Sequence, residues 1–265
     1  MEIYRAVLDR AKLAAMPENE RTLLLLLGHA SNEINVLSKL ILMIRKDDPP
    51  SLVFDHAEAG QTFILIRLLT GKLHEAWELF RTRVQSDPAI SKTYLPQLRP
   101  GANAALQALK RHFGQGSVLT AIRNKVAFHY SDKEGLTEAS FQVLPPKEPL
   151  QFYLSKTVGN TFYHASELVV QLSAISLMPV PPAAPDDTAS AEARAFAALC
   201  GEIITVSGHM TELFGEMIGL LGEPAIDNAP AEQLSELPKL SAFTLPYFFE
   251  EADALPQPAA MPAVP

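Results

Sequence analysis

Two long stretches of helix-forming sequence, separated by a pair of prolines, constrain the fold of this chain more than any other feature. The first, residues 18–48, repeats leucine, isoleucine and valine at helical spacing and stops at Pro49-Pro50. The second runs from about 51 to 86 with the same spacing. Prolines end a helix, and so short a break forces two helices of this length to turn back on each other. The sequence therefore predicts an all-α protein built on an antiparallel helical bundle.

The remaining sequence predicts shorter helices with irregular segments between them. Pro17 ends a short first helix. Further along the chain, Ser117 is the expected N-cap of the helix over residues 117–130. Three prolines make 86–100 a loop, and 139–156 alternates around a Pro-Pro turn as a small β-hairpin would. Further helices are expected over residues 102–113, 117–130 and 161–178. The expected organisation is a bundle over 1–178, a proline-rich linker over 179–187, an additional helix over 188–222, and an acidic, partly disordered tail over 223–265.

Hydropathy and cysteine content place the chain in a cellular compartment. The longest leucine run, Leu23–Leu27, gives way at once to polar residues, so no window approaches the roughly 20 apolar residues that span a bilayer. The charged, amphipathic first residues lack the apolar core of a secretion signal. Cys200 is the only cysteine, which excludes an internal disulfide and a thiolate metal cage. We expect a cytoplasmic protein with no membrane partner.

The charge of the chain is unevenly distributed. The formal net charge is −8, yet residues 81–125 carry eight lysines and arginines against a single acid, Asp87. Residues 126–265 are strongly acidic, and one hypothesis is that this segment covers the basic region; a solvated acidic tail is the alternative. The basic block predicts a local site for an anion such as RNA, and a solvated basic loop is again the alternative. The candidate RNA-binding residues in the block are Arg81, Arg83, Lys92, Arg99, Lys110 and Arg111.

The basic block leads into AIRNKVAFHYSD, residues 121–132, where polar groups interrupt an apolar segment. On a helix, Leu119, Ile122 and Val126 form an apolar stripe with Arg123 on one flank and His129 on the other. If the stripe packs into a groove or against a second copy, both side chains reach one cavity. Cleavage of RNA by its 2′-hydroxyl needs an acid or base, which histidine supplies, and a cation for phosphate, which arginine supplies.

The spacing of Arg123, Asn124 and His129 resembles the Arg-x(4–6)-His motif of the HEPN superfamily, a group of helical domains common in prokaryotic toxin, phage-defence and abortive-infection systems. The helices around HASNEINVLSKL (29–40) and LLTGKLHEAWELF (68–80) are similar to its abortive-infection branch. The resemblance implies a homodimeric four-helix bundle and a metal-independent endoribonuclease, with Arg123, Asn124 and His129 as catalytic residues and no cofactor. An antitoxin or regulatory protein is a possible partner. The likeness spans about residues 18–178.

Other polar residues near the motif have supporting or competing interpretations. Arg67 and His74 form a second Arg-x6-His pair on one helix face, and Arg67 otherwise needs an acidic partner, for which Glu33 is the candidate. Asn32 and Glu33 either fix helix register or support the active site. Lys125 and Tyr130 flank the motif; because Tyr130 directly follows the histidine, nucleotide modification by an antitoxin is not expected. His74-Glu75 lacks the second histidine of a zinc-protease motif, so no metal site is predicted.

Two other functions remain open from the sequence alone. One is a non-catalytic helical module that dimerises or docks a partner, with Arg123 and His129 as ordinary polar residues. The other is a binding module for a nucleotide or another phosphorylated ligand.

Overall fold

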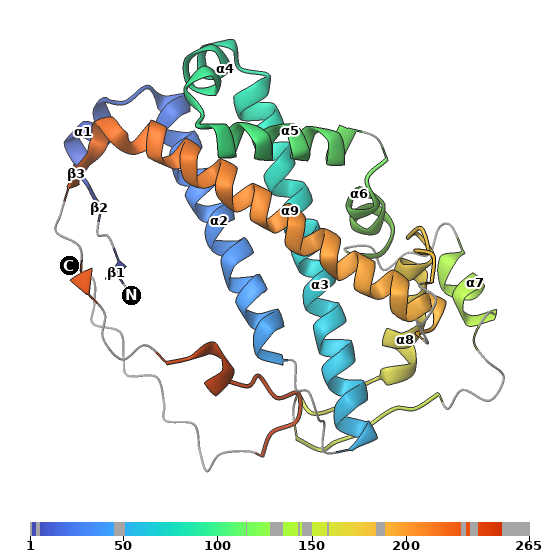
Figure 1. Ribbon diagram of the computed structural model, residues 1–265. Coiled ribbons are helices and arrows are strands. Elements are labelled where there is room, and N and C mark those ends of the chain that lie inside the picture. The colour runs from blue at the N-terminus through green and yellow to red at the C-terminus, as the bar shows by residue number, and fades with distance from the viewer. Residues whose placement is uncertain are drawn as a thin grey trace.

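The computed structural model describes residues 2–3, 6–44, 51–114, 116–127, 135–142, 144, 150–157, 159–183, 189–228, 232–233 and 238–250. Helices packed on one another make up most of this part of the chain, which confirms an all-α bundle. Figure 1 shows the long helices side by side and the short ones at the two ends.

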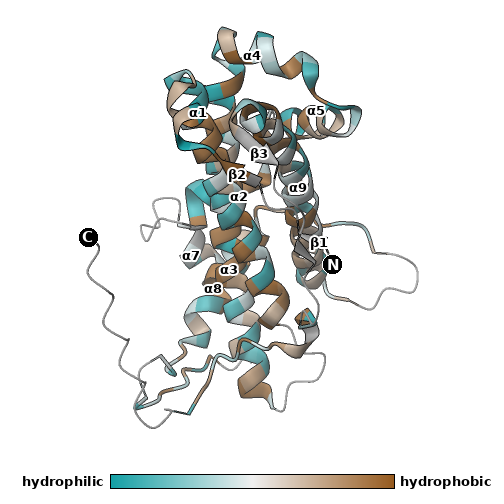
Figure 2. Cartoon of the chain, turned by 90° about the vertical axis from the view of Figure 1, so that its left-hand side faces the viewer, coloured by the Kyte–Doolittle hydropathy of each residue, from teal (hydrophilic) through white to brown (hydrophobic). Residues whose placement is uncertain are grey.

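The predicted pair of long helices is present. Helix α2 spans Glu18–Ile44 and helix α3 spans Leu52–Phe80, and they lie antiparallel (Figure 1). Residues 45–50 between them lie outside the described part. Hydrophobic residues recur along both helices (Figure 2), and those on the facing sides form the core. Leu27 and Phe63 are fully buried. Helix α3 continues into a π-helical turn, η1, at Arg81–Gln85.

The carboxy-terminal helix belongs to the bundle core. Helix α9 spans Ala191–Gly222 and crosses α3 and α2 obliquely (Figure 1). Leu199, Met210 and Phe214 on its inner face are fully buried. The additional helix expected over 188–222 therefore forms, and it shares one core with the bundle.

The proline-rich segment 86–100 is mostly helical, so its prediction as an irregular loop is wrong. Helix α4 spans Pro88–Tyr94, a 3-10 turn, η2, covers Leu95–Gln97, and helix α5 spans Pro100–Gly114. Prolines are compatible with the first turn of a helix, where a backbone N–H has no helical partner. Asp87 caps α4 by accepting hydrogen bonds from the backbone N–H groups of Ala89 and Ile90. The rings of Trp77, Phe80, Phe113 and Phe214 stack and join α3, α5 and α9.

The prediction of a β-hairpin over 139–156 is also wrong for those of its residues that the structure describes. Helix α7, Leu136–Gln142, covers its beginning, and helix α8 spans His164–Ile175. An isolated antiparallel bridge pairs Tyr153 with Phe162. Residues 143 and 145–149 lie outside the described part. Helix α6, Val118–Ile122, and the π-helical turn η3, Arg123–Ala127, precede α7.

The amino-terminal strands pair with the segment that follows α9. Antiparallel pairing joins β1 to β4 and β2 to β3, and helix α1 follows β2. Part of the expected acidic tail is thus ordered, while residues 251–265 lie outside the described part. The bounds are β1 Glu2–Ile3, β2 Ala6–Leu8, α1 Arg10–Ala15, the 3-10 turn η4 Glu223–Ala225, β3 Ile226–Asn228, β4 Glu232–Gln233, and the 3-10 turn η5 Leu240–Ala242.

Candidate functional site

The apolar stripe that carries the motif is buried inside the chain. Leu119 is 0%, Ile122 1% and Val126 7% exposed, and all three belong to the main hydrophobic core. Their partners lie mostly on α3, against which α6 and η3 pack. The stripe therefore packs into a groove of its own bundle. It does not form an interface between two copies, which corrects the second of the two arrangements expected from the sequence.

Arg123 is held in a defined orientation at the edge of this stripe. Its Nε and Nη2 atoms donate to Oε1 of Glu75 on α3, at 3.1 and 2.6 Å. Its Nη1 donates to Oδ1 of Asn124 at 3.0 Å. A guanidinium has five N–H donors, so these contacts leave two without a partner among the described residues. The Arg123 side chain is 33% exposed.

A histidine other than the expected one is close to Arg123. Burial lowers the pKa of His74, and the positive charge of Arg123 lowers it further, so His74 is a neutral imidazole at neutral pH. Its Nδ1 atom is buried and has no hydrogen-bond partner among the described residues. His74 precedes Glu75, and its ring meets Phe113 edge-on at 6.3 Å. Glu75 and His74 were not identified as neighbours of Arg123 from the sequence.

The other motif residues are only partly described. Asn124 and Lys125 are exposed on the same π-helical turn as Arg123. His129 and Tyr130 lie outside the described residues, since this stretch is described as far as Ala127.

The expected supporting residues Asn32 and Glu33 lie at the α2–α3 contact. Oε1 of Glu33 binds Nζ of Lys72 on α3 at 2.5 Å, while Asn32 is exposed. This cross-helix pair favours the register role over support of Arg123. The expected pairing of Arg67 with Glu33 is wrong, because Arg67 binds Oε2 of Glu167 on α8 at 3.1 Å.

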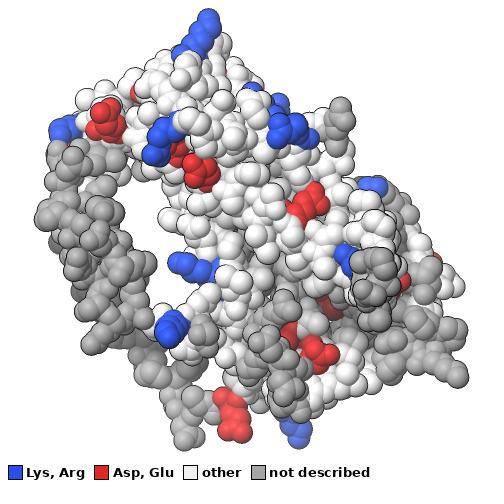
Figure 3. Space-filling view, in the orientation of Figure 1, with Lys and Arg blue, Asp and Glu red and all other residues white. Residues whose placement is uncertain are grey.

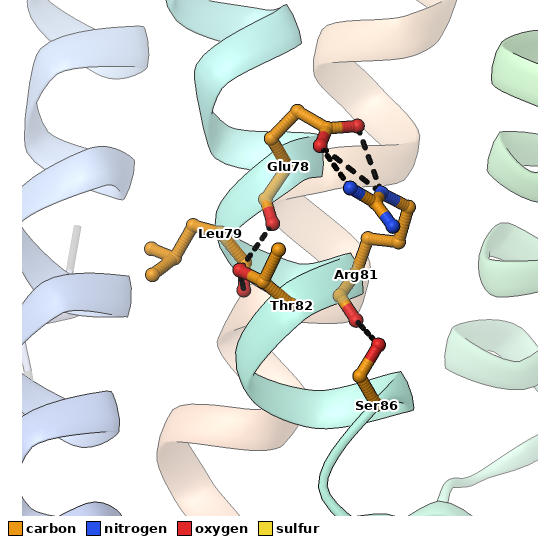
Figure 4. Close-up of polar contacts among 5 residues, drawn as sticks. All are labelled: Glu78, Leu79, Arg81, Thr82 and Ser86. Atoms are coloured by element: carbon orange, nitrogen blue, oxygen red, sulfur yellow. Dashed lines mark hydrogen bonds and ion pairs between the residues drawn. The ribbon is translucent and has the colours of Figure 1, made fainter.

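The predicted basic block is spread over several elements and partly neutralised. Arg81 forms three hydrogen bonds to Glu78 one turn earlier on α3 (Figure 4), and Arg99 binds Glu216 on α9. On the face seen in Figure 3, basic side chains alternate with acidic ones instead of forming one patch. The four other candidate RNA-binding residues are exposed; they are Arg83, Lys92, Lys110 and Arg111.

The turn before α6 is tied to α9 through a hydrogen-bonded relay. Ser117 stands at the cap position, but its hydroxyl makes no capping hydrogen bond, contrary to expectation. Its Oγ lies 3.0 Å from Nε2 of His112, whose Nδ1 lies 3.3 Å from Oε1 of Glu202. Burial lowers the pKa of His112, with a smaller contribution from His209. A neutral His112 can donate to Glu202 and accept from Ser117, so the relay fixes the start of the helix that carries Arg123.

The two perturbed imidazoles make stability depend on pH. In the unfolded chain His74 and His112 titrate near 6.5, and in the folded chain their pKa is lower. The unfolded state therefore binds more protons as the pH falls below this value, and the free energy of unfolding is expected to decrease from pH 7.5 to pH 5.5. Burial raises the pKa of Glu167 and Glu202. At a pH near the usual pKa of glutamate, these two groups therefore oppose the decrease in the free energy of unfolding.

Urea unfolding at pH 7.5, 6.5 and 5.5 measures this dependence. His112→Gln retains a donor and an acceptor but cannot gain charge, so its stability is expected to fall less over the same interval. A wild-type stability that stays constant or rises towards pH 5.5 contradicts the assignment.

No protein-family model, curated protein or solved structure matches this chain. In the described residues, no helix combines the length and hydropathy needed to cross a membrane. No group of three or more histidine, cysteine and acidic side chains in the described ranges has the geometry of a metal site.

Proposed function

We propose that this chain is a metal-independent endoribonuclease of the HEPN type. Arg123 binds the scissile phosphate, Asn124 orients it, and His129 moves the proton. In the reaction the 2′-hydroxyl loses its proton to a base and attacks the adjacent phosphorus. The bond to the 5′-oxygen breaks, and that oxygen takes up a proton. The products are a 2′,3′-cyclic phosphate and a 5′-hydroxyl.

The observation that supports this proposal is that the Arg123 guanidinium is held in one orientation and is still partly exposed. Glu75 and Asn124 hold it from two sides, and a third of the side chain stays open to solvent. A planar cation with two remaining donors matches two oxygens of a phosphodiester. A group held in place before the substrate arrives loses little entropy on binding, which is what stabilisation of a pentacoordinate phosphorus requires.

Purified protein is expected to cleave single-stranded RNA in the presence of EDTA and to leave a cyclic phosphate. Arg123→Ala and His129→Ala are each expected to lower the rate at least 100-fold with unchanged thermal unfolding, since each removes one group that acts in the transition state. Arg10→Ala is the matched control, because this exposed arginine lies on α1 and is not among the candidate RNA-binding residues. Wild-type rates in either motif variant contradict the proposal.

As the resemblance implies, the enzyme is proposed to act as a homodimer in a toxin or phage-defence setting, restrained by a regulatory protein. The contact between subunits then uses a surface other than the stripe, which is buried within each chain. Within the acidic segment 126–265, Phe248 of residues 238–250 packs on Phe54 near the start of α3, whereas Glu75 lies near the end of that helix. This part therefore does not cover Arg123.

A specific observation favours a second candidate, a non-catalytic helical module. The Glu75 carboxylate already occupies the side of the Arg123 guanidinium that a phosphate also fits, as in an ordinary surface ion pair. This candidate predicts no cleavage of any RNA by the wild type. Saturable binding of a nucleotide or inorganic phosphate without turnover, weakened by salt, identifies the third possibility of a phosphate-binding module.

A further inference from the structure

A segment without helix or strand, bent at Tyr247 and Phe248, lies at the end of the bundle where α2 ends and α3 begins; we call this end the base. We call residues 244–250, TLPYFFE, the strap. Figure 1 shows it in dark red beside the lower ends of α2 and α3. The backbone N–H of Leu245 donates to the carbonyl oxygen of Met43, in the last turn of α2, at 2.9 Å. The strap is therefore docked against the bundle through its own backbone.

Asn160 recognises the backbone of the strap. Its Oδ1 accepts from the N–H of Phe249 at 3.1 Å, and its Nδ2 donates to the carbonyl oxygen of the same residue at 2.5 Å. One amide side chain thus satisfies both polar backbone groups of a residue, as a neighbouring β-strand does. Asn160 is only 8% exposed. This pair of bonds selects an extended chain and is independent of the side chain at that position.

Aromatic side chains supply the rest of the contact. The ring of Tyr247 lies 4.9 Å from that of Phe162, and its hydroxyl donates to the carbonyl oxygen of Thr161 at 2.9 Å. The ring of Phe248 meets Phe54 of α3 edge-on at 5.6 Å. Phe248 also borders a pocket whose other lining residues are Val53, Phe54, Phe152, Tyr153, Leu154, Ser155 and Asn160. The base therefore presents aromatic surfaces next to the Asn160 amide.

Two glycines are fitted to these aromatic contacts. A Cβ on Gly60 would lie 2.3 Å from Cζ of Phe162, so only glycine leaves room for the tip of this ring against α3. Gly159 has a φ of +89°, a conformation that other residues rarely adopt, and a Cβ there would touch the ring of Phe249. The surface that contacts the strap therefore depends on these two glycines as well as on the aromatic side chains.

We propose that the base of the bundle is a peptide-binding site for a Pro-Tyr-Phe-Phe segment that bends at its Tyr-Phe pair, and that the strap is its resident ligand. Another protein that presents a segment of the same chemistry displaces the strap and docks in its place. The contact consists of a few backbone hydrogen bonds and three rings, a type of site that exchanges one segment for another. This inference does not depend on RNA cleavage.

A fluorescent synthetic peptide, TLPYFFE, tests this proposal on full-length protein. The tethered strap competes at an effective concentration on the order of 1 mM, so wild-type protein is expected to bind the free peptide weakly. The variant Tyr247→Ala/Phe248→Ala weakens the strap and leaves the receptor intact. It is expected to bind the peptide at least tenfold more tightly than the wild type, measured by fluorescence anisotropy. Equal binding to both proteins overturns the proposal.

Two further measurements show where the peptide binds. Asn160→Ala in the same strap variant is expected to weaken binding at least tenfold, because both backbone hydrogen bonds are lost. A peptide with an N-methyl group on its second phenylalanine, which corresponds to Phe249, removes one of these bonds without changing the protein. It is expected to bind at least threefold more weakly than the unmodified peptide. Full binding of the methylated peptide, or of a scrambled one, also overturns the proposal.

Discussion

Replacing Ile122 with aspartate is expected to unfold the protein. Ile122 is 1% exposed and lies between Leu119 and Val126 in the face of α6 and η3 that packs on α3. The substitution removes the apolar contacts of the side chain and places a carboxyl group where no partner is available. Such a change costs about 4–5 kcal/mol, most of the stability of an ordinary domain.

Ile204 provides a matched control for this substitution. It is also an isoleucine within a helix, α9, but it is 70% exposed. Ile204→Asp is therefore expected to change the free energy of unfolding by less than about 1 kcal/mol. Urea unfolding and size-exclusion chromatography of both variants separate the alternatives. A folded Ile122→Asp protein that dissociates from a dimer to a monomer would show that the stripe joins two copies.

Replacing Arg67 with methionine is expected to cost about 3 kcal/mol at pH 8, because the variant leaves Glu167 without its cationic partner. The two side chains are only 16% and 21% exposed. Burial already raises the pKa of Glu167, and Arg67 opposes that rise. Without Arg67 the pKa of Glu167 rises further, so the carboxyl group binds a proton more readily. The loss of stability is therefore expected to be smaller at pH 5 than at pH 8.

The surface pair of Arg81 and Glu78 is the control for this buried pair. Its side chains are 50% and 36% exposed, and Arg81→Met is expected to leave the free energy of unfolding nearly unchanged. The double variant Arg67→Met/Glu167→Leu is expected to recover much of the loss, since no charge is left unpaired. Urea unfolding at both pH values provides the measurement. An equal cost for Arg67→Met and Arg81→Met would mean that Glu167 remains solvated.

Much of the helical framework was predictable because it depends on local pattern. The apolar spacing and the proline pair located α2 and α3, and the pattern over 188–222 located α9 within three residues at its start. The segment 86–100 was not predicted correctly, because three prolines outweighed the capping signal of Asp87. The beginning of the expected hairpin forms α7, where packing against α8 overrides a weak alternation.

The candidate site was predictable only in part. The sequence singled out Arg123 and Asn124 by their motif, but it did not predict the hydrogen bond between their side chains. Glu75 is 48 positions away from Arg123, and only the packing of η3 on α3 brings their side chains together. Likewise, the diversion of the Ser117 hydroxyl from its capping role depends on His112 and Glu202, which belong to two other helices.

The sequence by itself determined the long helices and their apolar faces, since both follow from interactions within a few residues. The tertiary structure alone decided what each apolar face and each charge meets. The stripe beside Arg123 has the same composition whether it packs on α3 or on a second copy. The packing of the long helices forms a groove within the same chain, and the stripe fills this groove. Glu75 lies at the edge of the groove.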